Sequence, residues 1–433
     1  MQLRKLTQRL GHWVYSIGHS YWLVPAAMTL AAIVLAVVLI GLSVRFDSRL
    51  HETLGQWSVV KPGGARAILA TIAGSMMTVA GVTFSVTTLA LSHATANYGP
   101  RLFANFLKDR GSQITLGTFV AAFVFSVVTL AAVSTGDDGY DFVPHLALIV
   151  AFALSLAGVA VLIFFVQHAQ QRLYIASIVA RLGRQLVRRV PAIYGNDDDE
   201  ARRLEDSELP QRRSEIQATE SAYLQHVKDM SLVAAAQAHD AVVRLCYAPG
   251  QFVVRGTVLA EVFGGGDVDA AIAEEIHASL QFGDDRTPEQ DLMFVVDQIA
   301  QVSLRALSPG INDPFTANTC LDWLASFLAL LAGRSPQTPA MRDDQGDIRA
   351  LIPAPTFDDI LEHTLEQLRA EVCSNLISTR HAIPLLARLR SVCRGTELGA
   401  DFERHFARWR RTIDDNDWSA TDKATLDSLW TDH

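Results

Sequence analysis

The chain has 433 residues, of which 49% are hydrophobic and only 19% are charged. Soluble domains carry about 25% charged residues, so this composition excludes a disordered chain and argues against a wholly soluble protein. The charge is unevenly divided, with a net +9 in residues 1–190 and −18 in residues 191–433. We therefore expect a basic, apolar membrane half and an acidic, soluble half. The acidic half argues against nucleic acid as a partner.

Four windows of the first half contain no Asp, Glu, Lys or Arg, namely 22–44, 67–92, 111–136 and 142–167. A helix of about 20 apolar residues crosses the hydrocarbon core of a bilayer. The first window is too long for the apolar part of a cleaved signal peptide. The pattern predicts an α-helical membrane protein with four transmembrane helices. With a basic amphipathic stalk after the fourth helix, they form a transmembrane domain over residues 1–194.

The positions of Lys and Arg predict the orientation of these helices. Basic residues cluster before the first window, in the second connection and after the fourth window, whereas the third connection (137–141) has three acids and no base. Because basic residues are retained on the cytoplasmic side, we expect the N-terminus and the large C-terminal region to be cytoplasmic.

The second window contains a stripe of hydroxyl side chains on one helical face. Its members are Thr71, Ser75, Thr78, Ser85 and Ser92. A neighbouring face carries Ala67, Gly74, Gly81 and Thr88. Small and hydroxyl residues at this spacing either pack helices together or line an oligomeric pore. If they pack helices, the third window is the expected partner of the glycine face. The windows lack the carboxylates typical of proton-driven carriers.

The connection between the second and third windows carries a short amphipathic segment. Pro100 breaks the chain there, and the apolar Phe106 is accompanied by the charged Arg101 and Asp109. We expect a cytoplasmic elbow at the level of the lipid headgroups, which either anchors the chain or couples the soluble region to the second helix.

The acidic half is expected to be a mostly α-helical cytoplasmic α+β region. Residues 195–215 form an acidic linker, residues 216–265 a small β-module with turns at Gly250 and Gly256, and residues 266–433 a helical domain. Within that domain Glu362, His363 and Glu366 share one side of a helix, which we interpret as a solvated face.

A helix-capping or contact motif lies near residue 310. Its residues are Ser308, Pro309, Asn312, Asp313 and Pro314. Asp313 is expected to cap the following helix, and Pro314 occupies the first helical position, where its missing N–H costs nothing. The alternative is a subunit contact or a ligand loop.

Catalytic and cofactor signatures are absent from the sequence. There is no Walker-type phosphate loop, no nucleophile elbow and no His-Glu-x-x-His helix, and the four cysteines form no Cys-x-x-Cys pair. We expect no catalytic residue, no metal and no cofactor.

Three stretches together resemble a known bacterial family of predicted integral membrane proteins, the domain-of-unknown-function family twenty-two fifty-four. They lie at residues 81–117, 239–256 and 286–314. The resemblance implies the topology described above, in a bacterial inner membrane, and implies no activity.

Two functions are compatible with these observations. The first is a homo-oligomeric ion channel, with the second helix around its axis and a cytoplasmic regulatory domain. The second is a membrane-anchored scaffold or sensor without transport activity. Under either function, the expected partners of the protein are the lipid bilayer, further copies of the chain and an unidentified cytoplasmic ligand or protein. An enzyme is a third and weaker alternative.

Overall fold

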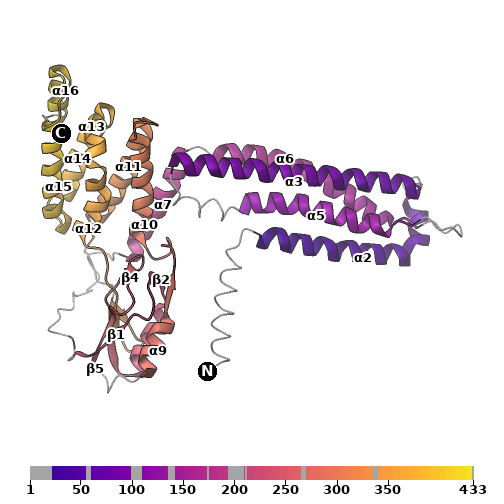
Figure 1. The fold of residues 1–433 in the computed structure, drawn as a ribbon, viewed down its shortest axis with the longest axis horizontal. Helices are drawn as coiled ribbons and strands as arrows, with labels where there is room; N and C mark the ends of the chain where they lie inside the picture. Colours follow the sequence, from indigo (N-terminus) through magenta and orange to yellow (C-terminus); the bar gives the residue numbers. More distant parts are fainter. Residues whose placement is uncertain are drawn as a thin grey trace. The chain divides into compact units, whose positions relative to one another are not determined.

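A computed structural model describes residues 22–54, 60–98, 110–134, 142–172, 175–193, 209, 212–264, 270–334 and 340–431. The chain divides into two compact units, Met1–Tyr174 and Ile175–His433. Figure 1 shows the helices of the first unit and the mixed helices and strands of the second. The elbow residues Pro100, Arg101, Phe106 and Asp109 lie outside the described residues.

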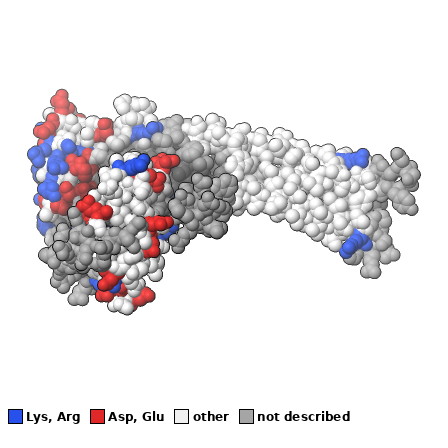
Figure 2. All heavy atoms as spheres, turned by 60° about the horizontal axis from the view of Figure 1, so that its bottom comes forward, with Lys and Arg blue, Asp and Glu red and all other residues white. Residues whose placement is uncertain are grey.

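The first unit consists of long apolar helices. They are α2 (Leu23–Leu54), α3 (Pro62–Tyr98), α5 (Arg110–Ala132) and α6 (His145–Arg172). Each contains a stretch long and apolar enough to cross a membrane, which confirms the four predicted spans. Figure 2 shows that the visible surface of these helices is almost free of charged side chains.

Helix α5 is the centre of the first unit and contacts α2, α3 and α6. Its contact with α2 is close because Gly117 has no side chain: a Cβ there would lie 2.6 Å from Met28 Sδ and 3.2 Å from Pro25 Cα. Its buried hydroxyls need no partner on another helix, since Ser126 and Thr129 each donate to the carbonyl four residues earlier at 2.8 Å.

The two faces of α3 have different surroundings. Leu69, Ile72 and Met76 are buried in the core of the first unit. Gly74 and Gly81 are exposed, and a Cβ on either would meet nothing within 4 Å. The expectation that α5 packs against the glycine face of α3 is therefore wrong. Larger apolar side chains bury more surface, and they make the contact instead.

The second unit contains a helical layer. Its members are α7 (Ile175–Ile193), α10 (Leu292–Leu307), α11 (Pro314–Leu331), α12 (Phe357–Leu361), the π-helical segment η4 (Glu362–Glu366), α13 (Gln367–Ser374), α14 (Leu376–Cys393), α15 (Glu397–Asp414) and α16 (Ala420–Thr431). Helix α7 packs against α10 and α11, and Gly183 lies directly against the ring of Trp323 on α11. By its packing α7 belongs to this unit, although the sequence pattern grouped it with the transmembrane domain.

Two small sheets form the β part of the second unit. Their strands are β1 (Arg212–Gln217), β2 (Ala222–Val227), β3 (Ala241–Leu245), β4 (Phe252–Val253), β5 (Val258–Gly264), β6 (Leu280–Gly283), β7 (Ala340–Arg342) and β8 (Ile348–Leu351). The orders are β1-β5-β3-β8-β7 and β4-β2-β6. Helices α8 (Asp229–Ala238) and α9 (Ala270–Ser279) contribute Leu232 and Ile276 to the core beneath them.

The β part extends beyond the module predicted at residues 216–265. Strand β6 pairs with β2, and β8 pairs in parallel with β3, through Val227 opposite Leu280 and Val243 opposite Ala350. These partners are 53 and 107 residues apart in sequence. Local periodicity does not reveal such pairing, which explains why the sequence predicts a helical domain over residues 266–433 without these strands.

Replacing Gly117 with Val should destabilise the first unit, because the added methyl groups force α2 away from α5. We expect a loss of about 1–3 kcal/mol, measured as a lower thermal unfolding midpoint in detergent. The matched control is Gly41→Val on α2, where a Cβ meets nothing within 4 Å. Equal losses in both variants would contradict the close α2–α5 contact.

Candidate functional site

A cluster of charged and polar side chains of the second unit surrounds η4. Helix α12 begins at a capping box, in which Thr356 N donates to Asp359 Oδ2 at 2.9 Å and Asp359 N donates to Thr356 Oγ1 at 3.1 Å. The next turn, Glu362–Glu366, is π-helical. Such turns are rare and are often found at functional sites. Here the turn directs His363 and Glu366 to different partners.

His363 ends a chain of ion pairs that leads to the β part of the unit. Its Nδ1 lies 2.8 Å from Asp297 Oδ1 on α10, and the other oxygen of Asp297 accepts from Arg286 Nη1 at 2.7 Å. Arg286 Nε donates to Asp291 Oδ2, also at 2.7 Å. Asp291 caps α10 by accepting from Phe294 N at 2.8 Å.

The electrostatics of this chain follow from its hydrogen bonds. Burial opposes ionisation of Asp297, but the hydrogen bonds from His363 and Arg286 outweigh it and lower the pKa of the carboxyl group. The hydrogen bond to Asp297 in turn raises the pKa of His363. The pair of Asp297 and His363 thus favours the ionised form of both side chains.

Gly250 connects this ion chain to a turn between strands. Its φ is +94°, a conformation that favours glycine, and a Cβ would lie 1.9 Å from Asp291 Oδ2. Gly256, in the next turn, also has a positive φ of +83°, but nothing lies within 4 Å of its Cβ position. Glycine is therefore favoured at position 250 for two reasons: the backbone has a positive φ, and the Asp291 carboxylate leaves no room for a Cβ.

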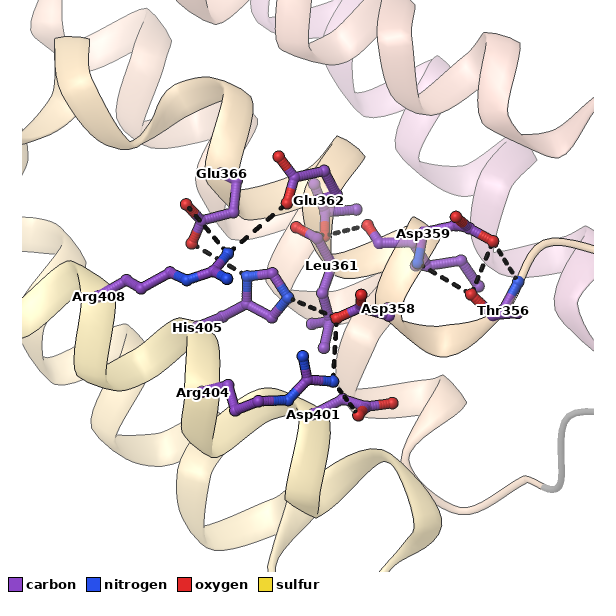
Figure 3. A network of polar contacts seen from close by, with 12 residues as sticks. Thr356, Asp358, Asp359, Leu361, Glu362, Glu366, Asp401, Arg404, His405 and Arg408 are labelled. Carbon is purple, nitrogen blue, oxygen red and sulfur yellow. Dashed lines mark hydrogen bonds and ion pairs between the residues drawn. The ribbon is translucent and has the colours of Figure 1, made fainter.

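His405 on α15 lies on the other side of η4 and is only 1% exposed (Figure 3). Its Nδ1 is 3.0 Å from Glu366 Oε1, and its Nε2 is 3.1 Å from Asp358 Oδ1. Carboxylates only accept hydrogen bonds, so this geometry requires a proton on both ring nitrogens. The hydrogen bond to Glu366, supported by the one to Asp358, raises the pKa of His405 against the effect of burial.

Arginines surround the same carboxylates. Arg369 Nε donates to Glu366 Oε2 at 2.9 Å, and Arg404 Nη2 lies 3.2 Å from Asp358 Oδ1 and also pairs with Asp401. Arg408 Nη1 lies 3.9 Å from Glu362 Oε2 and 4.0 Å from Glu366 Oε2. Figure 3 shows Arg408 directed toward both carboxylates. Positive and negative groups alternate across the contact between η4 and α15.

Three residues of this cluster could hold a metal ion. The ligand atoms of Glu362, Glu366 and His405 lie within 4.8 Å of one another. A bound cation would have to take the place of the proton on His405 Nδ1 and of the Arg408 guanidinium. Chemically, the arrangement favours a proton and an arginine, which hold η4 against α15.

The solvated face expected for Glu362, His363 and Glu366 is wrong for Glu366. The side chain of Glu366 is 6% exposed, against 62% for Glu362. The partners that bury it, above all His405, come from a helix about 40 residues later, which sequence spacing does not reveal. Arg286 and Asp291 belong to a stretch that carries the family resemblance, but no sequence motif indicates a role for Asp297.

The stripe residues of α3 remain together on its surface. Thr71, Ser75, Thr78, Ser85 and Ser92 are all exposed. Their hydroxyls are partly used within the helix, since Thr71 and Thr78 donate at 2.8 Å to the carbonyls of Ala67 and Gly74.

The motif at residues 308–314 forms a tight turn between α10 and α11. Ser308 caps the end of α10, Asn312 has a positive φ of 50°, and Asp313 Oδ1 accepts from Thr316 N at 3.1 Å. Pro309 lies within this turn, and Pro314 starts α11. The neighbouring Phe315 is 71% exposed.

Four membrane-spanning helices and a second, α/β unit define an integral membrane protein. The chain belongs to the family described as predicted membrane protein (DUF2254), which matches residues 18–388.

Mycobacterial proteins are among its relatives. The uncharacterized proteins Mb1321c of Mycobacterium bovis and Rv1290c of Mycobacterium tuberculosis (strain H37Rv) are each 30% identical over 315 residues, which is 71% of this chain and 60% of the relative. The chain thus spans about three-fifths of the length of these relatives. No solved structure matches it.

Replacing Gly250 with Ala should disrupt the contact with Asp291. The positive φ alone costs about 1 kcal/mol in any alanine variant, and Gly250→Ala should lose further stability by displacing a buried carboxylate. Gly256→Ala is the matched control, with the same backbone conformation and no neighbour. Chemical denaturation would measure both, and equal losses would refute the role of Asp291.

Replacing His405 with Gln should change the pH dependence of stability. Because the pKa of His405 is raised in the folded state, its contribution is complete below about pH 6.5 and is lost as the pH rises through the folded-state pKa. The free energy of unfolding of the variant should be lower by roughly 1–3 kcal/mol at low pH and should depend less on pH above pH 6.5.

The control for this variant is His381→Gln. His381 Nε2 lies 2.7 Å from Asp322 Oδ1, but the His381 side chain is 36% exposed and that of Asp322 52%, so we expect a loss below about 1 kcal/mol. Thermal unfolding across the pH range measures both. A His405→Gln profile parallel to that of the wild type would show that His405 is not the titrating group.

Proposed function

We propose that the protein is a homo-oligomeric ion channel of the bacterial inner membrane, with cytoplasmic termini, rather than an enzyme. The observation that carries this proposal is the surface of α3. Its hydroxyl stripe, defined by Thr71, Ser75, Thr78, Ser85 and Ser92, is exposed, and so are the neighbouring Gly74 and Gly81. A face of small residues allows close approach of helices between copies.

The chemistry of the hydroxyl stripe suits a pathway for ions. Hydroxyl oxygens can replace part of the hydration shell of an ion without a fixed charge. The donors of Thr71 and Thr78 are bonded within the helix, so their oxygens remain available as acceptors. The net charge of −18 in residues 191–433 should raise the local concentration of cations, and we propose a weak cation preference.

Cross-linking tests whether α3 faces another copy. Ser85→Cys should form disulfide-linked dimers in native membranes. Val159→Cys on α6, 54% exposed, is the control and should not, because we place it toward lipid. Equal cross-linking at both positions would exclude a specific α3 interface.

Conductance tests the channel itself. In planar bilayers Ser85→Val should lower the unitary conductance, since a polar lining group becomes apolar, whereas Ser155→Val on α6 should leave it unchanged. Oligomers that cross-link but pass no current under voltage, tension or pH change would refute the channel and favour a membrane-anchored scaffold or sensor.

A further inference from the structure

Helix α7 carries an exposed basic edge directly after the last transmembrane helix. Arg181, Arg184 and Arg188 are all exposed. At 100° per residue they fall within about 60° of the helix circumference. We call them the α7 arginine edge.

The opposite face of α7 is already occupied. Ile178, Val179, Leu182 and Leu186 are buried, and α10 and α11 pack against the helix. The centre of this buried face lies roughly 140° from the centre of the arginine edge. An amphipathic helix after a span often inserts its apolar face among lipids, but here that face is filled by protein. Only charge remains to interact with a membrane.

Two arginines of this edge, Arg184 and Arg188, lack the acidic neighbours that accompany other arginines of this unit. Arg286, Arg369 and Arg404 are paired with carboxylates. Across the described residues, neither Arg184 nor Arg188 forms an ion pair. The segment 168–190 contains five arginines and no acidic residue, and the region that follows it, residues 191–433, is strongly acidic.

The chain also limits how far the edge lies from the bilayer. The fourth span ends at Gln167, and α7 begins eight residues later at Ile175. Eight residues cover about 12 Å as a helix and at most about 28 Å when extended. Basic residues this close to a span are attracted to anionic lipid.

We propose that the α7 arginine edge binds the phosphate headgroups of anionic phospholipids, and so holds the second unit at the membrane surface. The interaction is electrostatic and needs no apolar insertion. It does not depend on channel activity or on oligomer formation.

The test uses the full chain in nanodiscs of neutral lipid, with or without phosphatidylglycerol. A fluorophore at Ser177→Cys, on the same side of α7, reports proximity to spin labels on the lipid headgroups. Cys246, the exposed cysteine among the described residues, is replaced by Ser. Burial raises the pKa of Cys373 to about 12 and of Cys393 to about 11, and Cys320 is fully buried, so these thiols should not be labelled at neutral pH.

We expect quenching to increase with phosphatidylglycerol and to weaken with salt. Arg184→Gln/Arg188→Gln should shift the equilibrium away from the membrane by about 30-fold, about fivefold per arginine. The control pair Arg388→Gln/Arg394→Gln on and beside α14 removes the same charge from exposed positions and should have no such effect.

Three outcomes would overturn the proposal. Quenching could be equal in neutral and anionic discs, or absent from both. The two double variants could lose it equally, which would indicate a general charge effect. Inorganic phosphate could reproduce the response of the fluorophore in neutral discs, and the edge would then be a site for free phosphate.

Discussion

The cost of placing a charge in hydrocarbon determines how this chain is organised. Each charged residue at the centre of a spanning helix costs about 3 kcal/mol or more, and the four apolar windows contain none. Between the apolar stretches, the close contacts described above therefore come from shape, and hydroxyls bond to their own helix. Two examples are the close contact of Gly117 with Met28 and the hydrogen bond from Ser126 to the carbonyl of Ala122. By contrast, a charged contact, from Arg66 Nη2 to Val133 O at 2.9 Å, lies at the end of the spans.

In the second unit, which is outside the hydrocarbon in the proposed topology, ion pairs hold the helices around η4 together. η4 has a carboxylate–arginine chain on one side and a protonated histidine between two carboxylates on the other. Both depend on groups that are buried or nearly so, where an unpaired charge is costly. The π-helical turn lets one short segment serve the two networks, because His363 and Glu366 bind different helices.

The sequence predicted features that depend on neighbouring residues and missed those that depend on contacts between residues far apart in the chain. The spans followed from composition, and Asp313 and Pro314 are arranged as local helix-start rules expect. The packing of α7 could not be predicted, because a basic amphipathic pattern suits a lipid surface and a protein surface equally. Glu362 and Glu366 are the same residue type four positions apart, and only the distant α15 distinguishes them.

The packing of α7 also fixes where the second unit can be separated from the membrane. The acidic linker at residues 195–215 is the obvious boundary by composition, yet a fragment starting there would lack Ile178, Val179, Leu182 and Leu186. The faces of α10 and α11 that they cover, with Trp323 against Gly183, would be left open to water. The smallest fragment with a complete core must therefore start at or before Ile175, only eight residues beyond the last span.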